Sequence, residues 1–332
     1  MLNWEIEQRK LELKYTWKIS RNSSDFKINS IITVSGGNWK GMGEVAPNIR
    51  YNETPELMVT GFHRFIAAGG AFVNDLSELE TLLGELKLPN ALRFGIESAY
   101  IHYICHADKT DIFTFFGIQK PTGLQTSFSL PIMEISELEN FYQHNQLERF
   151  SKLKVKVNKE SALDLLEEVN RITKQPLIID GNEAWKNPDE VIAFMHALTP
   201  YNVSLIEQPM PAGLNEEYIY LKVNSPYLLF ADESICDHGD FELLKTQFHG
   251  INMKLMKAGG YMNGIRILNE AVKHNMHTMV GCMIETTLGI SSAMHLCAGV
   301  EYVDLDGFLI VKDEPFNLVS EKNGLLFSTV DY

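Results

Sequence analysis

Short apolar segments recur along the last two thirds of the chain, and four of them end in an acidic residue. The segments are TSFSLPI, KLKVKV, PLIID, VSLIE, YLLFAD, GINMKL, HTMVG and YVDLD. Amphipathic stretches separate them, and one of these, SALDLLEEVNRI, carries apolar residues at helical spacing behind Ser161, a candidate N-cap. Eight strands alternating with helices predict a (β/α)8 barrel over residues 121–309. A doubly wound sheet is the competing fold, but no GxGxxG turn follows any of the strands.

The first 120 residues follow a different pattern. LELKYTW and FKINSIITVSG alternate as half-buried strands do, and the glycines of SGGNWKGMGE suit a hairpin turn. Three stretches with helical character follow at residues 52–70, 77–86 and 89–107. We therefore expect an α+β capping domain over residues 1–120, completed by the C-terminal segment at about 310–332.

Charge and composition exclude several classes of protein. The net charge of −14 disfavours a nucleic-acid-binding surface, which needs clustered basic residues. No apolar run approaches the ~20 residues of a membrane span. The four cysteines are scattered without a CxxC pair, which indicates free thiols in a reducing cytoplasm. We therefore expect a soluble cytoplasmic protein, with self-association into a homo-oligomer left open.

The residues at or near the ends of the predicted strands recur at regular intervals along the sequence. Neighbouring members of this series are 22 to 27 residues apart, about one βα unit: Lys154, Asp180, Glu207, Asp232, Lys254, Gly281 and Asp304. In a closed barrel, such positions meet at the carboxyl ends of the strands, where the βα loops converge and barrel enzymes hold their active sites. The series therefore predicts an active site at that end.

Asp180, Glu207 and Asp232 end three consecutive strands. Carboxylates that converge in a partly desolvated barrel mouth repel one another unless a cation lies among them. Oxygen ligands without histidine or cysteine nearby favour a hard ion such as Mg²⁺. Each acid alone is better explained as a helix cap or a surface ion pair, but three at successive strand ends predict a magnesium site.

Lys154 and Lys156 share one face of the second strand, and Lys254 ends the sixth strand, which lies opposite in an eight-stranded ring. A substrate carboxylate on the metal would have an amine on each side, which suits removal of an α-proton from one face and its return to the other. A lysine can act as a base only when it is neutral, and the ammonium group of Lys154 favours the neutral form of Lys156. The alternative, a solvated strand face paired with acids, suits an edge strand better than a barrel strand.

Asp304 and Asp306 point the same way from the eighth strand. Two carboxylates beyond the metal site suit a substrate ammonium group. Pairing with lysines of the protein, or capping of a helix, are the alternatives.

Together these motifs resemble the enolase superfamily, in its muconate-lactonising subgroup, and most closely its dipeptide epimerases of the Ala-Glu epimerase type. LKVKV is similar to the family's KxK strand, and IIDGNEAW, LIEQP and FADES are similar to its three metal-ligand segments. INMKLMKAGG is similar to its sixth-strand lysine segment, at Lys254 rather than Lys257, and VDLDG to its aspartate pair. Asn158 and Gly181 depart from the residues usual at those positions.

The resemblance implies an isomerase that needs Mg²⁺ and epimerises the C-terminal residue of a dipeptide, such as L-Ala-D/L-Glu released from peptidoglycan. It assigns the metal to Asp180, Glu207 and Asp232, the proton transfers to Lys156 and Lys254 with help from Lys154, and the substrate's amine to Asp304 and Asp306.

The resemblance also implies a loop of the capping domain over the substrate, which we place at SRNSSDF, residues 20–26. Within it, Arg21 could pair with the side-chain carboxylate of a substrate glutamate. A loop arginine that faces water is the alternative. For the whole protein, the alternatives are a lyase of the o-succinylbenzoate synthase type, another lyase or cycloisomerase of the superfamily, and a catalytically inactive binding protein.

Overall fold

The computed structural model describes residues 1–329, and its largest sheet is the predicted barrel. Eight parallel strands follow one another in the order β12-β11-β10-β9-β8-β7-β6-β5, which is the reverse of their order in the chain. Each lies within the segment that the sequence predicted. They are β5 (Phe128–Leu130), β6 (Leu153–Lys156), β7 (Leu177–Asp180), β8 (Val203–Glu207), β9 (Leu228–Ala231), β10 (Gly250–Met253), β11 (His277–Gly281) and β12 (Tyr302–Asp304).

Hydrogen bonds across the seam between β5 and β12 close the ring. The Ser127 amide donates to the Val303 carbonyl at 3.0 Å. The Ser129 amide donates to Asp306 Oδ2 at 2.5 Å, and Ser127 Oγ donates to Asp304 Oδ1 at 2.7 Å. Closure through these groups rules out the doubly wound sheet, which has two free edges.

Helices follow the barrel strands, as the alternating pattern predicts. They are α5 (Ile135–His144), α6 (Ala162–Ile172), α7 (Pro188–Ala197), α8 (Asn215–Asn224), α9 (Phe241–Gln247), α10 (Leu255–Ala258), α11 (Tyr261–Lys273) and α12 (Thr287–Met294), with a 3-10 turn at Leu147–Arg149. Ser161 stands at the N-cap of α6, but its side chain makes no capping hydrogen bond. Instead, its amide and its hydroxyl both donate to Asn158 Oδ1 at 2.8 Å, so the unusual Asn158 orders the loop after β6.

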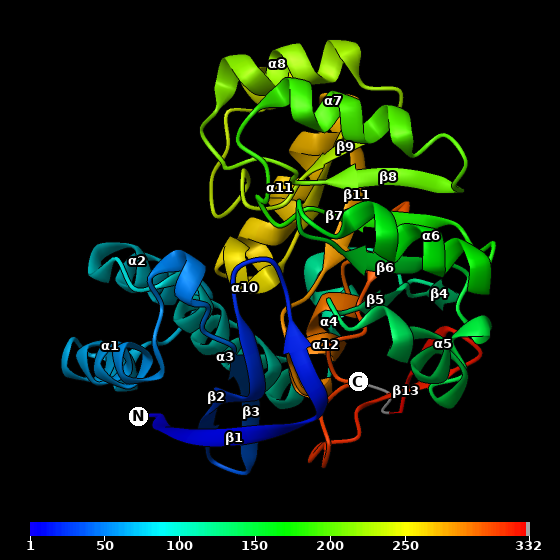
Figure 1. Cartoon of the computed structure of the whole chain (residues 1–332). Helices are drawn as coiled ribbons and strands as arrows, with labels where there is room; N and C mark the ends of the chain where they lie inside the picture. Colours follow the sequence, from blue (N-terminus) through cyan, green and yellow to red (C-terminus); the bar gives the residue numbers. More distant parts are fainter. Residues whose placement is uncertain (330–332) are drawn as a thin grey trace.

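The first part of the chain forms a three-stranded antiparallel sheet covered by helices, as the sequence indicated. Its strands are β1 (Asn3–Lys18), β2 (Ser23–Gly36) and β3 (Trp39–Val45). The helices are α1 (Pro55–Ala67), α2 (Leu76–Leu86), α3 (Asn90–Asp108) and α4 (Ile112–Phe116), with 3-10 turns at Ile49–Tyr51 and Gly70–Phe72. Figure 1 shows this domain, in blue and cyan, beside the barrel in green to orange.

The segment after the barrel contacts both parts of the molecule. The Lys14 amide donates to the Ile310 carbonyl and the Lys312 amide to the Glu12 carbonyl, both at 2.9 Å, so the chain first pairs with β1. It then forms β13 (Val319–Lys322) and β14 (Leu325–Ser328), and β14 pairs with β4 (Leu124–Gln125) just before the barrel. The domain limits given above remain a prediction, and residues 330–332 of the C-terminal segment lie outside the described residues.

Within residues 1–329, none of the helices combines the length and the apolar character that crossing a bilayer would require.

The backbone of β3 lies directly against the backbone of α3, because the two residues of β3 at this contact, Gly41 and Gly43, are glycines. A Cβ at Gly43 would lie 2.2 Å from the Gly95 carbonyl oxygen, and one at Gly41 would lie 2.1 Å from the Ala99 carbonyl oxygen. Contacts that short cannot form, so any other residue here would push α3 off the sheet. The capping domain therefore depends on glycine at both positions.

We predict that Gly43→Ala lowers the stability of the protein by about 1–3 kcal/mol, the usual cost of overpacking. Gly84→Ala is the matched control, because Gly84 lies in helix α2 with open space where a Cβ would be added. That substitution should be neutral or stabilise by up to about 1 kcal/mol, since alanine favours helix. Thermal unfolding of the two variants measures both effects, and equal midpoints would contradict the close packing of β3 on α3.

Candidate active site

The strand register places three of the predicted site residues side by side. Lys156 lies opposite Asp180 between β6 and β7, and Asp180 lies opposite Glu207 between β7 and β8. Each is the last residue of its strand. On the other side of β6, Lys154 lies opposite Ser129 of β5. The apolar residues before each strand end are buried in the barrel, so the polar ends meet at the carboxyl mouth, as predicted.

The three acids form one cluster. Asp180, Glu207 and Asp232 each offer a carboxylate oxygen, and these oxygens all lie within 4.8 Å of one another. Asp180 and Glu207 are fully buried, and Asp232 is 3% exposed. Three buried carboxylates at this separation need positive charge among them. The predicted grouping of the acids is confirmed.

The surroundings of the acids differ in their effect on protonation. Burial alone would raise the pKa of Asp180, but the ammonium groups of Lys156 and Lys154 outweigh it and hold this pKa at about 2. Burial likewise opposes the ionisation of Asp232, yet Lys254 and Lys257 hold its pKa well below the usual range. For Glu207 burial prevails, and its pKa is raised to about 7.

The donor set fits a hard divalent cation. All three side chains offer oxygen, which Mg²⁺ prefers. Glu207 Oε2 is buried and accepts no hydrogen bond of good geometry, although Lys154 Nζ lies 2.9 Å away. A buried oxygen with free lone pairs that faces two other carboxylates is the arrangement that a metal ion completes.

Lys154 lies at the centre of the site and is 1% exposed. Its ammonium group lies 2.7 Å from Asp304 Oδ2, 2.9 Å from Glu207 Oε2 and 3.2 Å from Asp180 Oδ2. Burial opposes its charge, but these carboxylates outweigh burial and raise the pKa of Lys154 well above its ordinary value. Lys154 is therefore a permanent cation among the acids, and a solvated strand face is excluded.

Lys156 and Lys254 approach the site from strands that lie four apart in the sheet order. Lys156 Nζ lies 2.5 Å from Asp180 Oδ2, and Lys254 Nζ lies 2.9 Å from Asp232 Oδ2. Both are nearly buried, with 8% and 7% exposure, and both line one cavity of about 570 Å³. In an eight-stranded ring, side chains from strands four apart stand on opposite walls.

The aspartate pair lines the same cavity. Asp304 forms an ion pair with Lys154 and accepts a hydrogen bond from Ser127 Oγ. Pairing with a lysine of the protein, which was one alternative to binding a substrate amine, therefore does occur for Asp304. The Asp306 carboxylate accepts the Ser129 amide and forms no ion pair among the described residues. Burial, and then the charge of Asp304, raise the pKa of Asp306 to about 7.

Arg21 lines the cavity from the loop between β1 and β2, and it is bound to the barrel. Its guanidinium group lies 2.8 Å from Glu183 Oε2 and 2.6 Å from Glu233 Oε1, and it also donates to the Asn182 carbonyl at 2.9 Å. Glu183 in addition binds Arg50 through both carboxylate oxygens at 2.7 Å. The loop is thus tied to the βα loops, and Arg21 does not simply face water.

No role was predicted from the sequence for Lys257, which forms an ion pair with Asp232. Lys257 Nζ donates to Asp232 Oδ1 at 2.5 Å, to the Asp232 carbonyl at 2.6 Å and to the Asn252 carbonyl at 3.0 Å. Lys254 is the N-cap residue of the short helix α10 and Lys257 lies within it, and the sequence favoured Lys254 as the lysine at the strand end. In the structure, Lys254 lines the cavity, whereas Lys257 is buried against the backbone.

Gln208 was also missed, although it follows Glu207 in the LIEQP motif. Its Oε1 accepts the Asp232 amide at 2.9 Å and the Ser234 amide at 3.1 Å. Its Nε2 donates to the Tyr218 hydroxyl at 2.8 Å. Gln208 therefore links the loops that carry the second and third acids.

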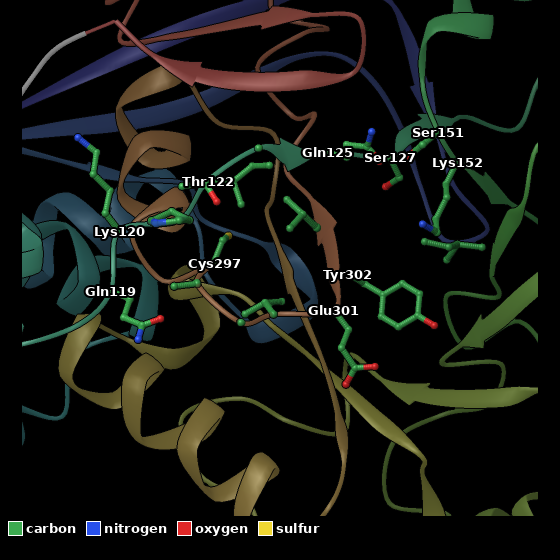
Figure 2. Close-up of a pocket in the computed structure, with 18 residues that line it drawn as sticks. Gln119, Lys120, Thr122, Gln125, Ser127, Ser151, Lys152, Cys297, Glu301 and Tyr302 are labelled. Atoms are coloured by element: carbon green, nitrogen blue, oxygen red, sulfur yellow. The ribbon is translucent and has the colours of Figure 1, made fainter.

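A second pocket lies at the opposite end of the barrel, where β5, β6 and β12 begin (Figure 2). Ser127, Lys152 and Tyr302 line it, together with Glu301. Glu301 pairs with His277 at 2.6 Å, and the Lys152 ammonium group lies 5.9 Å from the centre of the Tyr302 ring. Glu301 and Lys152 therefore already interact with neighbouring side chains. The cluster of Asp180, Glu207 and Asp232 lies at the opposite end of the barrel.

The chain is similar to known proteins over most of its length. The family model described as Enolase C-terminal domain-like matches residues 137–314. An L-Ala-D/L-amino acid epimerase of Pedosphaera parvula is 30% identical over 324 residues, which cover 95% of this chain and 93% of that protein. An L-Ala-D/L-Glu epimerase of Bacteroides thetaiotaomicron is 32% identical over 64% of this chain and 55% of that protein.

Solved structures agree on the fold. A substrate-liganded complex of the L-Ala-D/L-Glu epimerase from Bacillus subtilis has a TM-score of 0.89 at 21% identity and covers 98% of this chain and 95% of that chain. A dipeptide epimerase from Enterococcus faecalis, complexed with Mg and L-Leu-L-Tyr, has a TM-score of 0.86 at 23% identity and covers 96% of this chain and 92% of that chain. The chain therefore belongs to the enolase superfamily, and within it groups with the dipeptide epimerases.

Proposed function

We propose that this protein is a Mg²⁺-dependent dipeptide epimerase that inverts the α-carbon of the C-terminal residue of its substrate. One observation carries the proposal. Lys156 and Lys254 enter a single cavity from strands four apart, and the acid cluster lies on the arc between them. Curated relatives with epimerase names support the same reaction class.

Asp180, Glu207 and Asp232 would hold the Mg²⁺ ion. When bound, this ion supplies positive charge that stabilises the anion left by loss of the α-proton. Lys154 adds a second, permanent positive charge at the same place, since its ammonium group lies within 3.2 Å of three carboxylates. An α-proton next to a carboxylate is a very weak acid, so stabilisation of the anion is the main requirement of the reaction.

Lys156 and Lys254 would transfer the proton. One of them, in its neutral form, removes the α-proton from its face of the carbon, and the other, as an ammonium group, donates a proton to the opposite face. The two lysines exchange these roles for the two epimers of the substrate. Their present partners are metal-ligand carboxylates, Asp180 and Asp232, so the ligands and the bases are in direct contact.

Asp304 and Asp306 would bind the free amine at the N-terminus of the dipeptide. Asp306 suits this role because it lines the cavity and, among the described residues, no cationic side chain forms an ion pair with it. Arg21 remains a proposed contact of the C-terminal residue's side chain. A substrate carboxylate would have to share its guanidinium group with Glu183 and Glu233, or displace one of them.

For the biological role, we propose action in the cytoplasm on dipeptides such as L-Ala-D/L-Glu that derive from peptidoglycan. The names of the Bacteroides thetaiotaomicron and Escherichia coli relatives support this substrate class.

We predict that Asp232→Asn weakens Mg²⁺ binding by about 100-fold or more. Loss of an outer-shell partner already lowers metal affinity by about 10- to 100-fold, and loss of the ligand itself should lower it at least as much. Isothermal titration of chelator-treated protein with MgCl2 measures this affinity directly. Glu216→Gln, which changes an exposed acid of α8, is the matched control and should bind as the parent does. Equal affinities for the two variants would place the ion elsewhere.

We predict opposite stereochemical defects for the two lysines. Lys156→Ala should lose α-proton exchange with solvent deuterium for one epimer of the C-terminal residue by about 10²–10⁴-fold and keep it for the other. Lys254→Ala should show the reverse preference. Proton NMR or mass spectrometry in D2O follows the exchange, with the exposed Lys159→Ala as control. Loss of exchange for the same epimer in both variants would refute the two-sided arrangement.

Substitution of the aspartate pair distinguishes the epimerase hypothesis from that of a lyase of the o-succinylbenzoate synthase type. Asp306→Asn should lower kcat/KM for dipeptides roughly 30- to 1,000-fold, because a desolvated ammonium group loses its charged partner. The double variant with Asp304→Asn should be lower still. A lyase has no ammonium group to bind, so full activity of these variants in an elimination assay, without dipeptide turnover by the parent, would favour the lyase.

A further inference from the structure

One lysine of the capping domain faces the active-site cavity without any role in the reaction proposed above. Lys27 lies in β2 and lines the cavity. It shares a face of the strand with Asn29, whose side chain donates to the Ile284 carbonyl of the barrel at 3.0 Å. Leu11, directly opposite Lys27 on β1, packs in a cluster with Ile284 and Ile310. Lys27 therefore points from the capping sheet toward the barrel, among apolar side chains.

Every other cationic side chain that lines this cavity is paired with a carboxylate. Lys154, Lys156 and Lys254 are paired with the acids at the strand ends, and Arg21 and Arg50 are paired with Glu183. Over residues 1–329, Lys27 has neither an ion pair nor a hydrogen bond to its ammonium group. Burial lowers the pKa of Lys27, and no nearby anion opposes that effect. A half-buried cation without a partner costs free energy, which a bound anion would recover.

We propose that Lys27 binds a carboxylate carried by the side chain of the substrate's N-terminal residue. This inference rests on the proposed function and adds to it a preference for an acidic first residue. Ile284 follows β11, and Ile310 follows β12, the strand whose end carries Asp304 and Asp306. Lys27 thus lies on the side of the cavity that receives the amine of the first residue.

The position of Arg21 is consistent with a cavity in which the two residues of the substrate lie on different sides. Its partners Glu183 and Glu233 belong to the loops after β7 and β9, on the side of the metal ligands. Arg21 therefore lies near the side chain of the second residue, and Lys27 near that of the first. The apolar groups around Lys27 suit the methylene groups of a glutamate side chain, and its ammonium group suits the terminal carboxylate.

The test compares acidic dipeptides with their neutral amides. Deuterium incorporation in D2O gives kcat/KM for L-Glu-L-Ala and L-Gln-L-Ala, and for L-Ala-L-Glu and L-Ala-L-Gln. In the parent protein, L-Glu-L-Ala should be favoured over L-Gln-L-Ala. Lys27→Met removes the charge at similar side-chain length, and it should lower this Glu-to-Gln ratio about 10- to 100-fold. Lys27→Arg, which restores a cation, should retain most of the ratio.

Lys40→Met is the control, because Lys40 is an exposed lysine of the neighbouring strand β3. It should leave the ratio for the first residue at the parent value. A merely structural role of Lys27 would lower kcat/KM for the acid and the amide alike, so an unchanged ratio in Lys27→Met overturns the inference.

The remaining outcomes are also decisive. If Lys27→Met instead alters the ratio between L-Ala-L-Glu and L-Ala-L-Gln, the carboxylate is read at the second residue and the assignment to the first is wrong. If neutral dipeptides exchange but the parent shows no preference for L-Glu-L-Ala, this inference fails and the epimerase proposal stands. If no dipeptide exchanges, the proposed function fails, and this inference with it.

Discussion

The balance between buried carboxylates and buried ammonium groups at the barrel mouth is the constraint on which the rest of the site depends. The acids are Asp180, Glu207 and Asp232, and the ammonium groups are those of Lys154, Lys156, Lys254 and Lys257. Each acid has an ammonium group within 2.9 Å. Removing one partner from such a pair costs about 3–5 kcal/mol, since it leaves a buried charge uncompensated. A divalent ion among the acids would take over part of this balance, so that Lys156 and Lys254 could turn toward a substrate.

The sequence alone predicted the barrel and its acid cluster, because both follow from periodicity. Short buried strands at intervals of one βα unit repeat the same geometry, so residues at equivalent positions must meet. The role of Lys257 was not predictable in this way. Lys254 ends the sixth strand segment and precedes α10 as its N-cap residue, whereas Lys257 lies within α10, so its contacts depend on how that helix packs. Contacts between distant loops, such as the pair formed by Arg21 and Glu183, carry no periodic signal either.

The position of the capping sheet over the barrel rests on two buried glutamates at helix N-termini. Glu44 of β3 accepts the amides of Thr286 and Gly289 at the start of α12, both at 3.0 Å. Glu97 of α3 accepts the amides of Tyr261 and Met262 at the start of α11. A carboxylate at a helix N-terminus satisfies unpaired amides and complements the helix dipole. Asn29 of β2 donates to the same Glu44 carboxylate at 2.8 Å, so this contact helps to fix the orientation of β2 and therefore the direction in which Lys27 points.

The two sides of the cavity then differ in how their cations are held. On the side of β7 and β9, Arg21 and Arg50 share Glu183, so the cationic groups there hold the capping loops to the barrel. On the side of β11 and β12, Lys27 of the capping sheet has no carboxylate partner within residues 1–329, and it lines the same cavity as Asp304 and Asp306. In the substrate orientation proposed above, an acidic first residue would bring its amine to the aspartates and its carboxylate to Lys27. The two sides of the cavity thus differ in kind: the cations near β7 and β9 are ion-paired, whereas Lys27 has no ion pair within residues 1–329.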